Sequence, residues 1–95
     1  MQRYHFTLYV AGTSGRSEQA RRNLEALARA HLGGHCDITT VDVLTDPEAA
    51  EAHRILTTPT VVRTHPAPAR RVTGDLSNIT SVLHALDLPT LDSTT

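Results

Sequence analysis

Two β-rich segments separated by a long amphipathic segment occupy the first 44 residues, and this succession constrains the fold more than any other feature. In residues 4–10, Phe6, Leu8 and Val10 alternate as they do in a strand with one buried face. Residues 36–44 form a second β-branched stretch, whose broken alternation predicts a central strand buried on both faces. Two strands joined by one helix must run parallel, with a right-handed crossover. We therefore predict a βαβ unit.

The segment between these strands is typical of one long helix with marked ends. Its apolar face recurs at the spacing i, i+4, i+7, i+8 and i+11, at Ala20, Leu24, Leu27, Ala28 and His31. Ser14 or Ser17 can cap the first turn, because a hydroxyl oxygen there accepts a free backbone N–H. Gly33 and Gly34 supply the left-handed conformation that often follows a helix. We expect the helix to end at this glycine pair.

A short second helix is predicted after the second strand. Asp46, Pro47 and Glu48 stand in the order of an N-cap followed by the first two helical residues. The apolar residues of this helix would be Ala49, Ala52, Ile55 and Leu56.

The rest of the chain predicts a hairpin and a final helix. A β-rich run starts after Pro59, is broken by the prolines of residues 66–68 and resumes at residues 70–73. The clearest helical stripe follows, at Ile79, Val82, Leu83 and Leu86. Ser77 is the expected cap of this last helix.

The predicted order βαβαββα, with a proline directly before the third strand, is that of a thioredoxin-like α/β domain with a mixed four-stranded sheet. A chain of 95 residues has room for one such core, so residues 1–95 are expected to form a single domain. The polar residues 89–95 are expected to be a frayed tail.

Composition excludes several functions. Cys36 is the single cysteine, so one chain can form no disulfide, no Cys-x-x-Cys redox pair and no thiolate zinc cluster. Nine arginines against ten acidic residues give a net charge of −1, which argues against nonspecific nucleic-acid binding. No apolar run approaches the length of a membrane span or a signal peptide, so no membrane role is expected. We expect a cytoplasmic protein.

Several ordered blocks of sequence together resemble one known family. These blocks are Leu8-Tyr9-Val10-Ala11-Gly12, Val41-Asp42-Val43-Leu44, Ile55-Leu56-Thr57-Thr58-Pro59-Thr60, Gly74-Asp75-Leu76-Ser77 and Leu86-Asp87-Leu88. In this order and spacing they look like the KaiB family of circadian clock proteins, across roughly residues 4–88.

This resemblance implies a non-enzymatic protein that docks on the ring of a KaiC-like RecA-family ATPase. A KaiA-like protein or a sensor kinase would be further partners. In the KaiB pattern, basic residues at positions that match Arg22, Arg54 and Arg71 lie on the ring-binding side, and Tyr4 matches an aromatic residue. The resemblance therefore implies that these four residues contact a partner.

The resemblance also implies a metamorphic protein. Members exchange between a tetrameric ground state with a rearranged C-terminal half and a thioredoxin-like monomer, which requires two packings of similar free energy. The segment involved here would include Gly74, Asp75, Ala85, Asp87 and Pro89. Ala85 replaces a glycine common in the family, and Pro89 falls where the ground state would run its last strand. Both changes favour the monomer, with the tetramer as the alternative.

Redox and thiol chemistry give a second functional hypothesis. Thioredoxin-like enzymes place a nucleophilic cysteine after the first strand, but residues 12–16 hold none, and Cys36 is expected to be an ordinary part-buried residue. Pro59 matches the cis-proline of the thioredoxin groove. In the alternative function, backbone after Pro59 would pair with a peptide or glutathione, and Asp75 and Ser77 would receive the γ-glutamyl end.

Neither a metal nor another cofactor is predicted. His31 and His35 are four residues apart, but Gly33 and Gly34 end the helix between them, so the two imidazoles do not share a helical face. The glycines of residues 12–15 lack the lysine and spacing of a phosphate-binding loop and are typical of a strand-to-helix turn.

Overall fold

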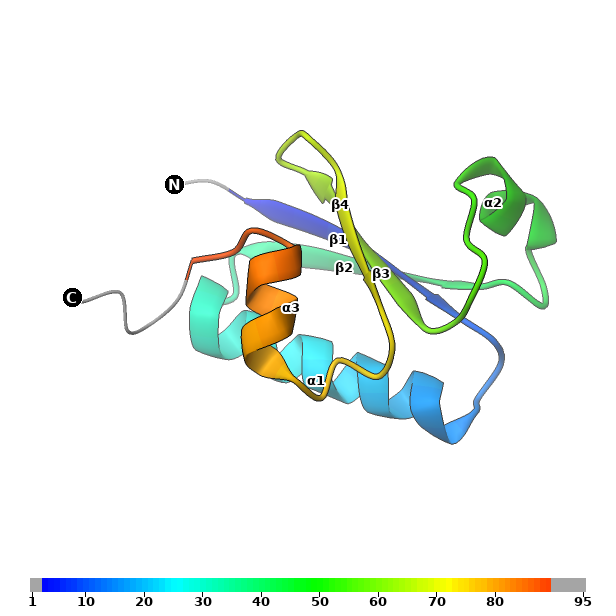
Figure 1. Ribbon diagram of the computed structural model, residues 1–95, viewed down its shortest axis with the longest axis horizontal. Helices are drawn as coiled ribbons and strands as arrows, with labels where there is room; N and C mark the ends of the chain where they lie inside the picture. Colours follow the sequence, from blue (N-terminus) through cyan, green and yellow to red (C-terminus); the bar gives the residue numbers. More distant parts are fainter. Residues whose placement is uncertain (1–2, 90–95) are drawn as a thin grey trace.

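The computed structural model describes residues 3–89 and has the predicted order βαβαββα (Figure 1). Its elements are β1 (Tyr4–Val10), α1 (Gly15–Leu32), β2 (Cys36–Asp42), α2 (Pro47–Ala52), β3 (Thr60–His65), β4 (Arg70–Thr73) and α3 (Ile79–Ala85). The four strands form one mixed sheet in the order β2-β1-β3-β4. The predicted thioredoxin-like fold class and element order are therefore confirmed.

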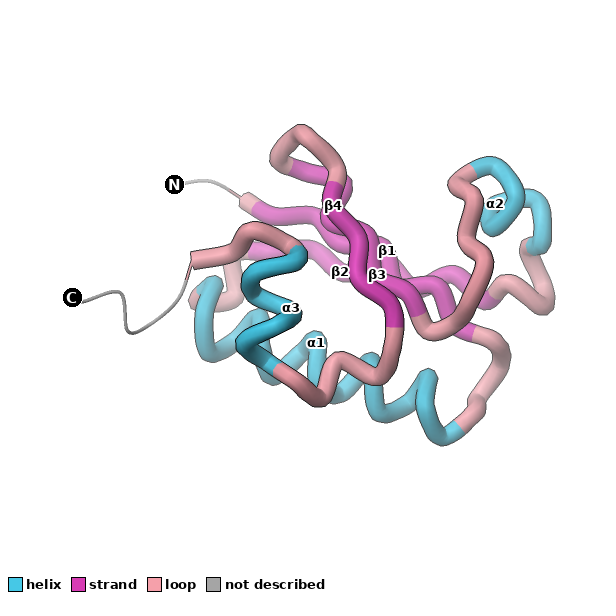
Figure 2. Tube along the Cα trace, viewed as in Figure 1, coloured by secondary structure: helices cyan, strands magenta, loops and turns pink. Residues whose placement is uncertain are grey.

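The βαβ unit at the start of the chain is also confirmed. β1 and β2 run parallel, with Tyr4 opposite Cys36 and Val10 opposite Asp42. β3 pairs antiparallel with the other edge of β1, and β4 pairs antiparallel with β3. β1 and β3 are thus the two central strands, and each has neighbours on both sides (Figure 2).

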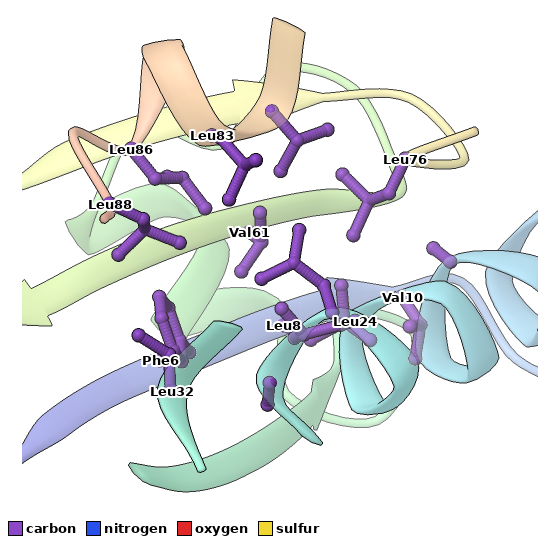
Figure 3. Packing of buried hydrophobic residues seen from close by; sticks show 14 residues of the cluster. Phe6, Leu8, Val10, Leu24, Leu32, Val61, Leu76, Leu83, Leu86 and Leu88 are labelled. Atoms are coloured by element: carbon purple, nitrogen blue, oxygen red, sulfur yellow. The ribbon is translucent and has the colours of Figure 1, made fainter. Parts of the chain in front are cut away.

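The core lies between one face of the sheet and the two helices α1 and α3 (Figures 1 and 3). Phe6, Leu8 and Val10 of β1 point into it, as their alternation predicts. The helices and the C-terminal segment contribute Ala20, Leu24, Leu27, Ala28, Leu32, Val82, Leu83, Leu86 and Leu88. Each buried leucine or valine of this kind contributes about 1.5–3 kcal/mol to folding.

The ends of α1 are set by the residues that the sequence indicates. The Ser14 hydroxyl oxygen accepts the Ser17 backbone N–H, so Ser14 is the N-cap. Gly33 lies in the left-handed region with φ of 59° and donates its N–H to the Ala28 carbonyl. A residue with a Cβ would be strained there, which explains why the helix ends at a glycine.

The prediction that the second strand is central and buried on both faces is wrong. β2 is an edge strand, ends at Asp42 rather than Leu44, and has no fully buried residue. Ile38 packs on the core from one face, while the neighbouring Asp37 and Thr39 are exposed. The β-branched composition of this segment indicates a strand, but it does not determine whether that strand lies at the edge or in the centre, which depends on what packs against it.

The second helix is shorter than predicted. Asp46 is its N-cap, with a side-chain oxygen that accepts the Ala49 N–H at 3.2 Å, but the helix ends at Ala52. Ile55 lies beyond the helix, and Leu56 is 91% exposed. None of the six helical residues is buried, so α2 adds little apolar burial to the fold.

The last helix has a different cap from the predicted one. The Asn78 side chain accepts the Ser81 N–H at 3.1 Å, so Asn78 and not Ser77 caps α3. The Ser77 N–H instead donates to Asp75 Oδ1 at 3.0 Å, which makes Ser77 part of a turn. From sequence, either Ser77 or Asn78 could cap this helix. Ser77 belongs to the turn made with Asp75, which leaves Asn78 as the cap.

The C-terminal half has the arrangement of the thioredoxin-like state. It consists of the β3–β4 hairpin followed by α3 packed on the core, and not of the rearranged ground state that the family resemblance offers as an alternative. Ala85 is the last residue of α3, and Pro89 is exposed at the end of the described chain. Most of the predicted frayed tail lies outside the described residues.

Candidate docking surface

Arg54 and Arg71, two of the four predicted partner-binding residues, are joined by hydrogen bonds. Arg71, on β4, donates from Nη1 to the Arg54 carbonyl at 3.1 Å and from Nη2 to the His53 carbonyl at 2.8 Å. Arg54 follows the end of α2 with φ of 54°, an uncommon conformation for a residue with a side chain. The guanidinium of Arg71 therefore fixes the backbone that carries Arg54.

Tyr9 supports the same region from the sheet. Its side chain points away from the core face of Leu8 and Val10, and its ring centroid lies 6.1 Å from that of His53. Burial raises the pKa of the Tyr9 phenol; the charge of Arg71 opposes this rise and Asp46 adds to it. The end of α2 thus rests on a buried tyrosine at the outer face of the sheet.

Two exposed leucines flank α2. Leu44, 70% exposed, precedes the helix, and Leu56, 91% exposed, follows it. A side chain at Gly12 would place its Cβ 3.3 Å from Leu44 Cδ1, and the φ of 63° at this position also favours glycine.

Leu44, Arg54, Leu56 and Arg71 are called the α2 surface below. Large apolar side chains beside cations are typical of protein contacts, but a single exposed leucine is common on any surface.

The arginines of the α2 surface have no acidic partner among residues 3–89. The side-chain ion pairs found there involve Arg3, Arg21 and His5. α2 itself has acidic residues, with Asp46 at its N-cap and Glu48 and Glu51 within it. The charges in this region are therefore segregated: acidic groups lie along α2, and basic groups lie at its C-terminal end.

Tyr4 and Arg22 lie elsewhere. Tyr4 starts β1, pairs with Cys36 at the end of the sheet away from α2, and stacks on Phe6 with ring centroids 6.3 Å apart. Arg22 is exposed on α1, where it donates to Gln19 Oε1 at 3.2 Å. The structure brings Arg54 and Arg71 together, but it places Tyr4 and Arg22 on separate parts of the molecule.

The turn where thioredoxins have their thiol is held by structural hydrogen bonds. Asp42 Oδ1 accepts the N–H groups of Gly12 at 3.0 Å and Leu44 at 2.9 Å, and so ties the β1–α1 turn to the end of β2. The Ser17 hydroxyl accepts the Ala11 N–H at 3.3 Å. The sequence offered no signal that Asp42 holds the β1–α1 turn, because Gly12 lies 30 residues before it.

Cys36 is half-buried at the opposite end of the sheet from this turn. Burial raises the pKa of the Cys36 thiol; Asp37 adds to the rise, and Arg3 opposes it. A thiol with a raised pKa is less ionised at neutral pH and hence a poorer nucleophile. Cys36 is part-buried, as expected, and its raised pKa makes it a poor nucleophile.

The Thr58–Pro59 peptide bond is cis, as the thioredoxin comparison led us to expect for Pro59. The hypothesis that a peptide pairs with the backbone after Pro59 does not hold for β3, because β1 and β4 already occupy both of its edges. The Pro59 carbonyl accepts the Gly74 N–H at 2.9 Å. No free strand edge remains beside this proline within the described sheet.

The residues that the family resemblance assigns to fold switching surround α3. Gly74 and Asp75 lie before it, and Gly74 has φ of 108°. Ala85 ends the helix, while Asp87 has φ of 53° and Pro89 is exposed. The chain thus changes direction at both ends of α3.

Residues 3–89 contain neither a cluster suited to a metal ion nor a helix suited to span a membrane. No group of three or more histidine, cysteine or acidic residues in that range is arranged to hold a metal ion. His31 lies in α1 and His35 beyond the glycine pair that ends it. Within the same range, no helix combines the length and apolar character that a membrane span requires.

Comparison with known families gives a match across most of the chain. A family model described as the KaiB domain matches residues 7–88. The circadian clock protein KaiB3 of Synechocystis sp. is 39% identical over 88 residues, which cover 93% of this chain and 86% of that protein. The circadian clock oscillator protein KaiB of Synechococcus elongatus is 40% identical over 85 residues, covering 90% of this chain and 83% of that protein.

Solved structures agree on the fold. The N-terminal domain of Synechococcus elongatus SasA has a TM-score of 0.74 at 20% identity, over 92% of this chain and 86% of that chain. Chloroplastic thioredoxin z has a TM-score of 0.68 at 23% identity, over 90% and 79%. At these identities the solved structures show a shared thioredoxin-like fold. The matching family model and the similar sequences show that the chain belongs to the KaiB family of circadian clock proteins.

Proposed function

We propose that the protein is a non-enzymatic component of a clock or timing system that docks on the ring of a KaiC-like ATPase. The observation that carries this proposal is the Arg54–Arg71 unit. Arg71 fixes the Arg54 backbone, and neither arginine has an acidic partner among the described residues. Because the backbone that carries Arg54 is already fixed, binding through Arg54 costs less conformational entropy than binding through a mobile loop.

The leucines supply the apolar part of the proposed contact. Leu44 and Leu56 are largely exposed in the free chain, and covering one such side chain contributes about 1.5–3 kcal/mol. The acidic residues along α2 and the basic residues at its end fix the orientation, because a reversed partner would bring like charges together. A ring surface with carboxylates opposite Arg54 and an apolar patch opposite Leu56 would complement both the charges and the exposed leucines.

The absence of catalysis is part of the proposal. The single cysteine of the chain is Cys36, which is half-buried and lies far from the turn used by thioredoxin-like enzymes. An intramolecular disulfide cycle needs two thiols. With dithiothreitol as reductant, we expect insulin reduction at the rate of the buffer control, and turnover abolished by Cys36→Ser would contradict this.

Tyr4 and Arg22 are proposed as further contacts to the same ring, outside the α2 surface. Their assignment rests on the family pattern alone, and the two residues lie on β1 and α1. A KaiA-like protein or a sensor kinase with a KaiB-like domain would be a further partner. The ring-binding form is proposed to be the monomer.

The test is binding of the purified chain to the KaiC-like ATPase of the same organism. We expect Arg54→Glu to weaken binding by about 1–3 kcal/mol, with a marked dependence on salt. Leu56→Ala should weaken it by a similar amount with little dependence on salt. Arg29→Glu serves as the matched control, because Arg29 is exposed at the far end of α1.

Two results would contradict the proposal. If the chain did not associate with the ring at any salt concentration, the ATPase ring would be excluded as the partner. Equal affinities for Arg54→Glu, Leu56→Ala and the wild type would exclude the α2 surface as the contact. Arg22→Glu would then show whether α1 carries the contact instead.

A further inference from the structure

A small cavity lies where the first turns of α1 and α3 meet the end of β4. Its volume is about 170 Å³, and its walls include Arg16 of α1, residues 72–78, and Ser81 and Val82 of α3. None of these residues belongs to the α2 surface. Pockets for drug-sized ligands span roughly 300–1,000 Å³, so this cavity suits a ligand of about amino-acid size.

Two opposite charges border the cavity. The Arg16 guanidinium and the Asp75 carboxylate both line it, yet they form no ion pair with each other or with another described residue. Asp75 Oδ1 accepts the Ser77 N–H at 3.0 Å, and a carboxylate has further lone pairs for other donors. Hydrogen bonds from Ser77, and to a smaller degree the Arg16 charge, lower the pKa of Asp75 and so favour its charged form.

The wall that holds Asp75 is already ordered. The Asn23 side chain donates to the Asp75 carbonyl at 2.7 Å, and the Gly74 N–H donates to the Pro59 carbonyl at 2.9 Å. Leu76 is buried in the core directly after Asp75. A ligand would therefore meet a preformed wall and would spend little of its binding free energy on ordering this segment.

Apolar and hydroxyl groups complete the lining. Val72 and Val82 contribute an apolar part, and Ser77 and Ser81 add hydroxyl groups that can donate or accept. The cavity thus has a cation, an anion and a small apolar area within the space of one small molecule.

We propose that this cavity binds a small zwitterion whose ammonium and carboxylate groups stand on one carbon atom. The ligand carboxylate pairs with Arg16, the ammonium group pairs with Asp75, and the first methylene lies against Val72 and Val82. A free α-amino acid and the γ-glutamyl end of glutathione share this chemistry. Ordinary peptides lack it, because their terminal amino and carboxyl groups belong to different residues. The proposal is independent of ring docking.

The test is a titration of the full-length, ¹⁵N-labelled chain, followed by amide chemical shifts. The probes are L-glutamate, reduced glutathione and N-acetyl-L-glutamate, which keeps the carboxylates but lacks the ammonium group. We expect saturable shifts at Arg16 and residues 74–78 with the first two probes, at about millimolar dissociation constants. N-acetyl-L-glutamate should bind at least about tenfold more weakly, because Asp75 would lose its partner.

Variants locate the site. Arg16→Gln and Asp75→Asn should each weaken L-glutamate binding about tenfold or more. Asp75→Asn retains an oxygen for the Ser77 N–H, so the turn is preserved while the charge is removed. Arg29→Gln on the same helix is the control and should bind as the wild type does.

The affinities for L-glutamate and glutathione distinguish the two classes of ligand. Similar affinities would identify the α-amino acid group as the whole recognised unit, whereas tighter binding of glutathione would identify a γ-glutamyl peptide. No saturable shift with either probe would overturn the proposal. Equal binding of N-acetyl-L-glutamate, or unchanged affinity in both charge variants, would also overturn it.

Discussion

The two short helices α2 and α3 have nearly the same length but opposite relations to the core. α2 has six residues, none of them buried, while α3 has seven and buries Val82 and Leu83, with Leu86 buried directly after it. Helices this short are unstable in isolation. The difference shows that α3 is held by burial in the core, whereas α2 is held mainly by its cap and by Arg71, and therefore stays available to a partner.

An arginine holds the end of each helix, but in different surroundings. Arg63 is 3% exposed and donates to the carbonyls of Leu86 at 2.9 Å, Asp87 at 3.2 Å and Pro68 at 2.8 Å. Arg71 makes the same kind of contact at the end of α2 but is exposed. Buried hydrogen bonds to a charged donor contribute more than exposed ones. Arg63 therefore joins α3 to the β3–β4 hairpin firmly.

The largest expected difference between the helices comes from their leucines. Leu86→Ala should lower the free energy of unfolding by about 2–5 kcal/mol, because Leu86 is fully buried and its loss leaves a cavity. Leu56→Ala, beyond α2, should change it by less than about 0.5 kcal/mol. Urea denaturation measures both. Equal losses would mean that the two regions do not differ in burial.

The two arginines give the next largest contrast. Arg63→Met should lower the free energy of unfolding by about 2 kcal/mol, because three carbonyls at the end of α3 and in the hairpin lose a charged donor. Arg71→Met should cost at most about 1 kcal/mol. Hydrogen exchange should show faster opening of α3 in the first variant and of residues 53–54 in the second. Unchanged protection of α3 in Arg63→Met would contradict the role of Arg63.

The caps should separate global from local effects. Asn78→Ala should destabilise the whole fold by about 1 kcal/mol, because α3 unfolds together with the core. Asp46→Ala should loosen α2 with a smaller effect on global unfolding, since α2 buries no residue. Ser77→Ala keeps the backbone N–H that contacts Asp75 and should cost less than Asn78→Ala. A larger loss in Ser77→Ala would restore Ser77 as the cap.

The smallest expected effect is a pH dependence of the turn before α3. Hydrogen bonds from Ser77 lower the pKa of Asp75 from its ordinary value of 3.8. A lowered pKa in the folded state means that the stabilisation is complete above the ordinary value and is lost as the pH falls through the folded value. The protection of the amides of residues 75–78, measured relative to their intrinsic exchange rates, should therefore fall more at acidic pH in the wild type than in Asp75→Asn. The same pH response in both would exclude Asp75 as its source.

Local patterns predicted most of the secondary structure, and long-range contacts account for what they missed. The stripe from Ala20 to Ala28 and the caps at Ser14 and Gly33 are local signals, and they predicted α1 correctly. The edge position of β2 was not predicted, because β-branched residues indicate a strand, whereas its place in the sheet depends on tertiary packing.

The candidate site was predicted less completely than the fold. Arg54 and Arg71 are 17 residues apart, so no local pattern indicates that one holds the backbone of the other. Arg63 was missed altogether, because an arginine in a strand is usually exposed and its three carbonyl partners come from other segments. Contacts of this kind depend on the completed tertiary fold.

We propose that burial and Arg63 hold the C-terminal half in the β3–β4–α3 arrangement, so that the chain rests as a thioredoxin-like monomer. Ala85 is the last residue of α3, where alanine favours the helix over glycine by less than the about 1 kcal/mol of a helix interior, and Pro89 cannot donate to a strand ladder. About 1.4 kcal/mol changes a population ratio tenfold. Ala85→Gly combined with Pro89→Leu should therefore move the population toward the alternative fold.

Backbone chemical shifts and light scattering on one wild-type sample test this proposal. We expect helical shifts over residues 79–85, strand shifts over residues 70–73 and the mass of a monomer at micromolar concentration. Strand shifts across residues 83–88 together with the mass of a tetramer would contradict it.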